Sequence, residues 1–167
     1  MTPRVAFILG SDSDFPAVEN GIALLRRLQV GVVVEVSSAH RTPERTLELV
    51  RGFEKDGVEV IIAAAGGAAH LPGVVAAHTV LPVLGVPMVS PLSGLDSLLA
   101  MVQMPAGVPV AVFGIGEGGA TNAALFAAAL LAAKDPTLKD RLRAYRDEQR
   151  DKVVEKGRRL KDRLEKG

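Results

Sequence analysis

The chain lacks cysteine and tryptophan and has a single tyrosine among its 167 residues. Without cysteine it can form no disulfide bond, thiolate metal site or cysteine nucleophile, and it suits a reducing compartment. With Tyr145 as its one tyrosine, it has little to stack on a flavin ring. This composition disfavours a flavin-binding electron carrier.

Long apolar runs are also missing. Gly, Pro, His and Asp interrupt every stretch that could span a bilayer, so we predict no membrane segment. Residues 1–4 lead directly into a strand-like run rather than a signal peptide. We therefore expect a cytoplasmic protein.

The charge of the chain is nearly balanced, with a net value of +1. Residues 134–167 are the basic part, with 13 Lys/Arg against 8 Asp/Glu. Because these charges alternate in sign, we interpret the segment as a solvated helix face and expect no nucleic-acid partner.

Strand-like and helix-like segments alternate along the chain. Apolar runs predict strands at residues 4–9, 32–36, 58–63, 83–88 and 108–113, the second of them buried. Helical patterns predict helices at residues 14–29, 43–55, 72–79, 93–101, 117–133 and 136–165. The fold class is therefore α/β, a single three-layer α/β/α sandwich with a parallel sheet of about five strands, flavodoxin-like or Rossmann-like.

We expect one domain over residues 1–167, without repeats or a linker. The extra C-terminal helix, about 136–165, has an apolar stripe but no strand left to cover. It either packs on a neighbouring subunit or folds back on its own domain, and the sequence favours neither.

Polar side chains follow three of the predicted strands, and such strand ends form the ligand-binding edge of an open α/β sheet. The first loop holds Ser11, Ser13 and Asp14. Hydroxyls and the free N–H groups of a helix start suit a phosphate, whereas a carboxylate accepts hydrogen bonds from a sugar diol. The loop thus predicts a ribose-phosphate subsite, with simple helix capping by Ser13 or Asp14 as the alternative.

The second loop holds Ser38, His40 and Arg41, and Thr42 is the expected N-cap of the next helix. A histidine that exchanges protons near neutral pH stands here beside a fixed cation that can hold a phosphate. A solvated turn is the alternative for a single His-Arg pair.

The third loop holds Gly66, Gly67 and His70 among small apolar residues. Adjacent glycines let backbone N–H groups approach an anion closely, and the flanking alanines predict a small apolar pocket. A lone His70 is more often structural, and His78 is expected at the surface or in packing.

A glycine-rich segment at residues 114–119 matches the pattern G-x-G-x-x-G after a strand and before a helix. A dinucleotide site needs a further strand with an acidic residue about 20 positions on. Here Asp135 falls in a break, no strand follows, and Glu117 would face the pyrophosphate. We therefore do not expect NAD or FAD binding.

Four motifs in order make the chain similar to the PurE family of purine biosynthesis, from about residue 4 to the last helix. They are Gly10-Ser11-Asp12-Ser13-Asp14, Ser38-Ala39-His40-Arg41-Thr42-Pro43, Gly66-Gly67-Ala68-Ala69-His70-Leu71-Pro72-Gly73, and Leu92-Ser93-Gly94-Leu95-Asp96-Ser97-Leu98 followed by Val102-Gln103-Met104-Pro105. The second and third resemble class I, the N5-carboxyaminoimidazole ribonucleotide mutases. Class II enzymes, which carboxylate aminoimidazole ribonucleotide directly with CO2, typically differ in both the second and the third motif.

The resemblance implies an isomerase that moves a carboxylate from the exocyclic nitrogen to ring carbon C4 without metal, nucleotide or organic cofactor. It implies a homo-octamer with active sites at subunit junctions and a C-terminal helix that reaches a neighbour. By position, Ser11, Asp14 and Arg41 bind substrate and His40 is the acid/base. A non-catalytic ribose-phosphate binding protein is the alternative from another class, and it would not need His40.

Two departures from the family pattern concern loops. Residues 88–94 are one residue shorter than in many relatives, and residues 114–119 are richer in glycine than expected. Because of these differences the contacts made by the two loops are not predicted, while the expected reaction is unchanged.

Overall fold

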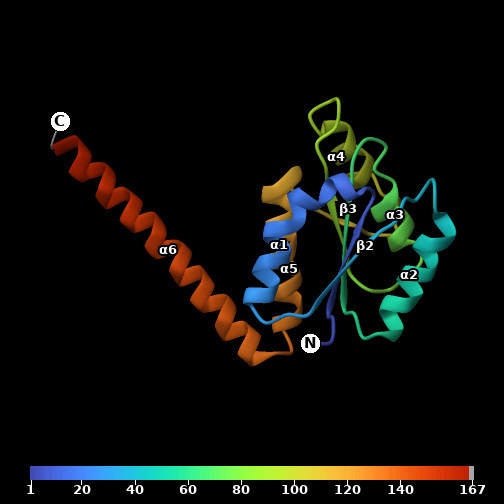
Figure 1. Cartoon of the computed structure of the whole chain (residues 1–167), viewed down its shortest axis with the longest axis horizontal. Helices are drawn as coiled ribbons and strands as arrows, with labels where there is room; N and C mark the ends of the chain where they lie inside the picture. The colour runs from blue at the N-terminus through green and yellow to red at the C-terminus, as the bar shows by residue number, and fades with distance from the viewer. Residues whose placement is uncertain (166–167) are drawn as a thin grey trace.

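The computed structural model describes residues 1–165 and contains a five-stranded parallel sheet (Figure 1). Its strands are β1 (Val5–Leu9), β2 (Val32–Val36), β3 (Val60–Ala65), β4 (Val83–Pro87) and β5 (Ala111–Val112). Their order in the sheet is β2-β1-β3-β4-β5, which is the flavodoxin-like order. The predicted fold class is confirmed.

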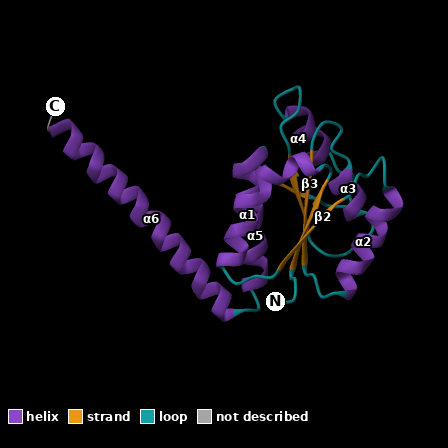
Figure 2. Ribbon diagram, in the orientation of Figure 1, coloured by secondary structure: helices purple, strands orange, loops and turns teal. Residues whose placement is uncertain are grey.

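Helices cover both faces of the sheet (Figure 2). One layer consists of α1 (Phe15–Arg27) and α5 (Gly116–Ala132); the other consists of α2 (Pro43–Lys55), α3 (Leu71–Ala76) and α4 (Leu95–Val102). Successive β1 residues point to opposite layers, as the period of a strand requires. Phe7 packs in the α1–α5 core, and Ile8 packs in the core under α2 and α3.

Several element boundaries differ from the sequence prediction. The first helix begins with the short 3-10 turn η1 (Asp12–Asp14), and β3 starts at Val60 rather than at residue 58. β5 is only two residues long. Pro109 lies in the predicted strand before it, where a missing N–H prevents regular pairing.

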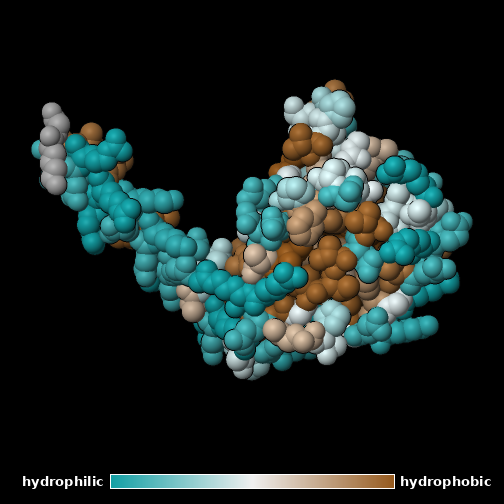
Figure 3. All heavy atoms as spheres, in the orientation of Figure 1, coloured by the Kyte–Doolittle hydropathy of each residue, from teal (hydrophilic) through white to brown (hydrophobic). Residues whose placement is uncertain are grey.

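Residues 32–36 form a strand, as predicted, but the prediction that this strand is buried is wrong. β2 is the edge of the sheet, its first four residues are half-buried, and Val36 is 43% exposed. Figure 3 shows apolar surface in the middle of the body, where β2 lies in Figure 1. Its valines are apolar enough for a sheet centre, but strand order, which tertiary packing sets, places them at an edge.

The last helix, α6 (Pro136–Glu165), folds back on its own domain at its start, which is one of the two predicted arrangements. Leu138 is fully buried and Tyr145 packs on the α1–α5 core, so the first turns fold back on the sandwich. The rest extends away from it (Figure 1), with Val153 67% and Leu164 75% exposed. Within residues 1–165, no helix is both long and apolar enough to cross a membrane. The last two residues of the basic segment lie outside the described residues.

Candidate active site

The three predicted loops meet at the carboxyl edge of the sheet and enclose a cavity of about 380 Å³. β1 lies between β2 and β3, so the loops that follow these three strands are neighbours. The cavity is lined by seven of the nine side chains or glycines predicted for the site: Ser11, Asp14, Ser38, His40, Arg41, Gly66 and His70. The other two, Ser13 and Gly67, are turned to different contacts.

The first loop is organised by Ser11. Its hydroxyl caps η1, accepting hydrogen bonds from the backbone N–H of Ser13 at 3.3 Å and from the Ser13 hydroxyl at 2.7 Å. Ser11 therefore caps the 3-10 turn. Asp14 occupies the N-cap position of α1, as the alternative prediction allowed, but its side chain makes no capping hydrogen bond, and Ser13 is not a cap. Ser13 supports the loop from outside the cavity, while Ser11 faces into it.

Asp14 ends the first loop and is partly buried in the cavity wall. Burial raises the pKa of its carboxyl, against a smaller opposing effect of the Ser11 backbone. A carboxylate that is partly desolvated beside a cavity is typical of a ligand-binding residue.

Asp14→Asn is expected to raise Tm at pH 7 by roughly 1–3 °C. Because the pKa of Asp14 is raised, the unfolded chain releases this proton at a lower pH than the folded protein. The charge therefore disfavours folding at neutral pH, and the gain should shrink as the pH falls toward about 4. Thermal melts of both proteins across this range test the prediction, and a lower Tm for the asparagine variant at pH 7 would contradict it.

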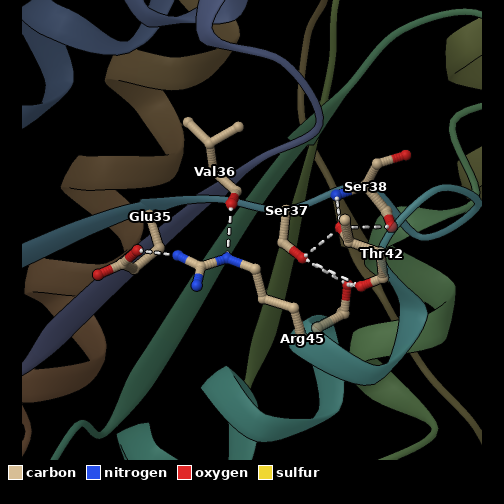
Figure 4. A network of polar contacts seen from close by, with 7 residues as sticks. Glu35, Val36, Ser37, Ser38, Thr42 and Arg45 are labelled. Carbon is tan, nitrogen blue, oxygen red and sulfur yellow. Dashed lines mark hydrogen bonds and ion pairs between the residues drawn. The ribbon is translucent and has the colours of Figure 1, made fainter.

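The second loop is held by a network of hydroxyls (Figure 4). The Thr42 hydroxyl accepts a hydrogen bond from Ser38 N–H at 3.0 Å and donates to the Ser38 carbonyl at 3.2 Å. The buried hydroxyls of Ser37 and Thr46 lie 2.8 Å apart below it. Thr42 occupies the N-cap position of α2, as predicted, but its side chain closes the loop instead of capping the helix.

Arg41 projects from this loop at an exposed position on the rim of the cavity. Its backbone N–H donates to the Ser38 hydroxyl at 3.2 Å, which fixes its direction of departure. Within residues 1–165 its guanidinium has no ion pair or hydrogen-bond partner, so all its donors are available to an anion.

His40 and His70 come from different loops and contact each other. Their Nε2 and Nδ1 atoms lie 2.7 Å apart, and the rings meet edge to face at 84°. One of these nitrogens must donate and the other accept, so a single N–H proton lies in this contact. Sequence alone placed both residues at the edge of the sheet but did not pair them.

In the third loop only one of the two glycines predicted to bind an anion through backbone N–H groups lines the cavity. Gly66 lines the cavity, but Gly67 N–H donates to the buried Ser97 hydroxyl of α4 at 2.9 Å. That N–H group is therefore not free for a carboxylate, contrary to the expectation for Gly67. The nearby wall is apolar, since Ala65, Ala69 and Leu71 are all buried.

Sequence reasoning missed the individual wall residues Gly10, Ala39, Ala65, Ala69 and Leu71. The small residues around Gly66 did predict an apolar pocket of this kind. Among residues 1–165, no cluster of three or more His, Asp or Glu side chains could hold a metal ion.

The family model described as AIR carboxylase matches residues 4–152. Relatives named "N5-carboxyaminoimidazole ribonucleotide mutase" come from Pyrococcus horikoshii, 50% identical over 96% of this chain and 90% of that protein, and Mycobacterium tuberculosis, 54% identical over 92% and 88%. The same name belongs to an Escherichia coli protein that is 50% identical over 91% of this chain and 90% of its own length.

A solved structure of Treponema denticola PurE has the same fold, with a TM-score of 0.83 and 26% identity over 92% of this chain and 95% of that one. The family match covers the sheet, all three site loops and the first half of α6. The chain belongs to the AIR carboxylase family.

Proposed function

We propose that the chain is an isomerase that converts N5-carboxyaminoimidazole ribonucleotide to 4-carboxy-5-aminoimidazole ribonucleotide in purine biosynthesis. Relatives with the mutase name share about 50% sequence identity with this chain over nearly its whole length. The observation that carries the proposal is the contact of His40 with His70 inside a cavity that also holds Ser11, Asp14 and Arg41. A protein that only binds a ribose phosphate has no need of such a pair. The cysteine-free chain suits a reducing compartment, and the cytoplasm is the proposed location.

The substrate is proposed to lie across the three loops. Arg41 and the Ser11 end of the first loop take the phosphate, with Ser13 supporting the Ser11 hydroxyl rather than facing the ligand. Asp14 accepts hydrogen bonds from the ribose, and Ser38 closes the second loop. Gly66 and the apolar wall leave room for the carboxylate and then for CO2, which His70 orients.

The proposed reaction moves the carboxyl group from the exocyclic nitrogen to ring carbon C4 and moves one proton the other way. The bond between the exocyclic nitrogen and the carboxyl carbon breaks, its electrons go to the nitrogen, and His40 supplies a proton there. C4 then attacks the released CO2, and His40 takes the C4 proton, so no net proton is consumed. Holding CO2 beside C4 makes recapture a positioned step instead of a bimolecular one.

The first experiment offers the purified protein N5-carboxyaminoimidazole ribonucleotide without ATP or added metal and follows the 4-carboxylated product. A parallel reaction contains aminoimidazole ribonucleotide with bicarbonate at physiological concentration. We expect fast product only in the first reaction. Product only in the second would make the chain a class II carboxylase, and product in neither would remove the proposed catalysis.

The protein is further proposed to work as a homo-octamer, with residues 1–167 as one catalytic unit in each copy. Exposed apolar side chains follow one another at helical spacing before and along α4: Leu92 66%, Leu95 53%, Leu99 46% and Val102 56% exposed. Contiguous apolar surface of this kind marks an interaction site. His40 and Arg41 are also exposed in the single chain, which suits a site that a neighbouring copy closes.

Leu99→Asp is expected to lower the molecular mass in solution from about eight chains to a smaller assembly, because it places a charge in an apolar contact. Val80→Asp is the matched control, since Val80 is 99% exposed and lies outside this stripe. Light scattering measures both. An unchanged mass for Leu99→Asp would remove the stripe from the proposed interface.

A further inference from the structure

The start of α4 is fixed by its own polar contacts. Two consecutive residues with positive φ, Ser93 at 57° and Gly94 at 84°, turn the chain into the helix. The Ser90 hydroxyl accepts a hydrogen bond from Gly94 N–H at 3.1 Å and donates to the Asp96 carboxylate. Such a local network holds the first turn of α4 in one place.

Ser97 lies in that first turn and carries a contact that leaves the helix. It is 0% exposed, and its hydroxyl accepts the hydrogen bond from Gly67 N–H at 2.9 Å. The two residues are 30 positions apart, so the bond ties α4 to the loop after β3. The bond is partly buried, and loss of the Ser97 hydroxyl would leave the Gly67 N–H facing an apolar side chain, which an apolar residue cannot compensate.

The loop that Ser97 holds leads directly to the histidine pair. Gly67 has a φ of 66° and Ala69 a φ of 47°, and Ala69 N–H donates to the Gly66 carbonyl at 3.2 Å. His70 is the next residue, with its Nδ1 2.7 Å from Nε2 of His40. The direction of the His70 ring therefore depends on a tight turn with two left-handed residues, one of which is anchored by Ser97.

We propose that Ser97 is a positioning residue for the His40–His70 pair. Building on the proposed function, it acts through the Gly67 turn and touches no substrate, since Ser97 does not line the cavity. The phosphate and ribose half of the site is built by other loops. Loss of the Ser97 hydroxyl should therefore affect the chemical step and leave binding of the ribonucleotide nearly intact.

Ser97→Thr and Ser97→Val form the matched test, because their side chains have the same shape and differ in one hydroxyl. We expect kcat of the valine variant to be about tenfold below that of the threonine variant, with KM within about threefold. Both are assayed with N5-carboxyaminoimidazole ribonucleotide at equal folded fraction. Equal kcat values for the two variants would overturn the proposal.

Two further variants separate positioning from general stability. Met101→Ala, also buried on α4 but in the apolar core, should lower Tm with kcat unchanged. Ser97→Ala, which adds no atoms, repeats the test if the larger side chains prevent folding, and a native kcat for it would overturn the proposal. The unaltered protein is assayed first. If it forms no product, the proposed function fails. If it turns over substrate, the proposed function stands, and the Ser97 variants then test the positioning role alone.

Discussion

Replacing His40 by asparagine is expected to lower kcat by about 10²–10⁴-fold, with KM within about threefold of the native value. Asparagine keeps a polar group of similar size at the rim of the cavity but cannot take up a proton near neutral pH. In the proposed binding mode the phosphate and ribose are held by Ser11, Asp14 and Arg41, which line the same cavity and are left in place by the substitution. Steady-state kinetics with N5-carboxyaminoimidazole ribonucleotide measure both constants.

His78→Asn is the control for this experiment. His78 is exposed, lies outside the cavity and makes its ring contact with the Val74 carbonyl at 2.8 Å. Its replacement should leave kcat and KM unchanged. Near-full turnover by His40→Asn would refute the acid/base role and would direct attention to His70, the other member of the pair.

The fold class was predictable because short-range sequence patterns determine the strands and helices. Alternating apolar runs and amphipathic stretches predicted five strands and six helices, and the loops after three strands carried polar residues. The edge position of β2 was not predictable in this way, because the side chains of an edge strand and a central strand can be equally apolar. Strand order depends on how helices pack across the sheet, which no single window of sequence contains.

The site was predictable as a set of residues but not as a set of contacts. Ser11, Asp14, His40, Arg41 and their neighbours were placed at one edge because parallel strands end there together. The pairing of His40 with His70 depends on how near β2 and β3 lie in the sheet, where they flank β1, and this is a property of the strand order. The contact of Gly67 with Ser97 joins residues 30 positions apart and had no local signal.

A substitution in the glycine-rich segment at residues 114–119 is expected to have a large effect on stability. A side chain on Gly119 would place its Cβ 1.6 Å from the carbonyl oxygen of Gly114 and 2.4 Å from its carbonyl carbon. These are backbone atoms of the turn that leads into α5, so they cannot move aside as a flexible side chain would. The glycine permits the first turn of α5 to pack directly on the preceding backbone.

This contact gives the G-x-G-x-x-G pattern a role in packing. α5 packs closely on α1, and Glu117 in its first turn accepts a hydrogen bond from Asn20 of α1. Gly21 of α1 faces α5 so closely that a Cβ would lie 3.0 Å from the Ala120 carbonyl oxygen. Gly119 and Gly21 therefore serve close packing around α5. Within residues 1–165 no strand follows α5 to complete a nucleotide fold.

Gly119→Ala is accordingly expected to lower the free energy of unfolding by about 3 kcal/mol or more, or to prevent folding. Gly118→Ala is the matched control, because this adjacent residue lies in the same helix and an added Cβ there would meet nothing within 4 Å. That substitution should leave stability within about 1 kcal/mol of native, on the stabilising side, because alanine favours a helix over glycine. Urea unfolding of both variants measures the difference. Equal midpoints would show that the turn before α5 yields to an added methyl group, and the glycines would then need another explanation.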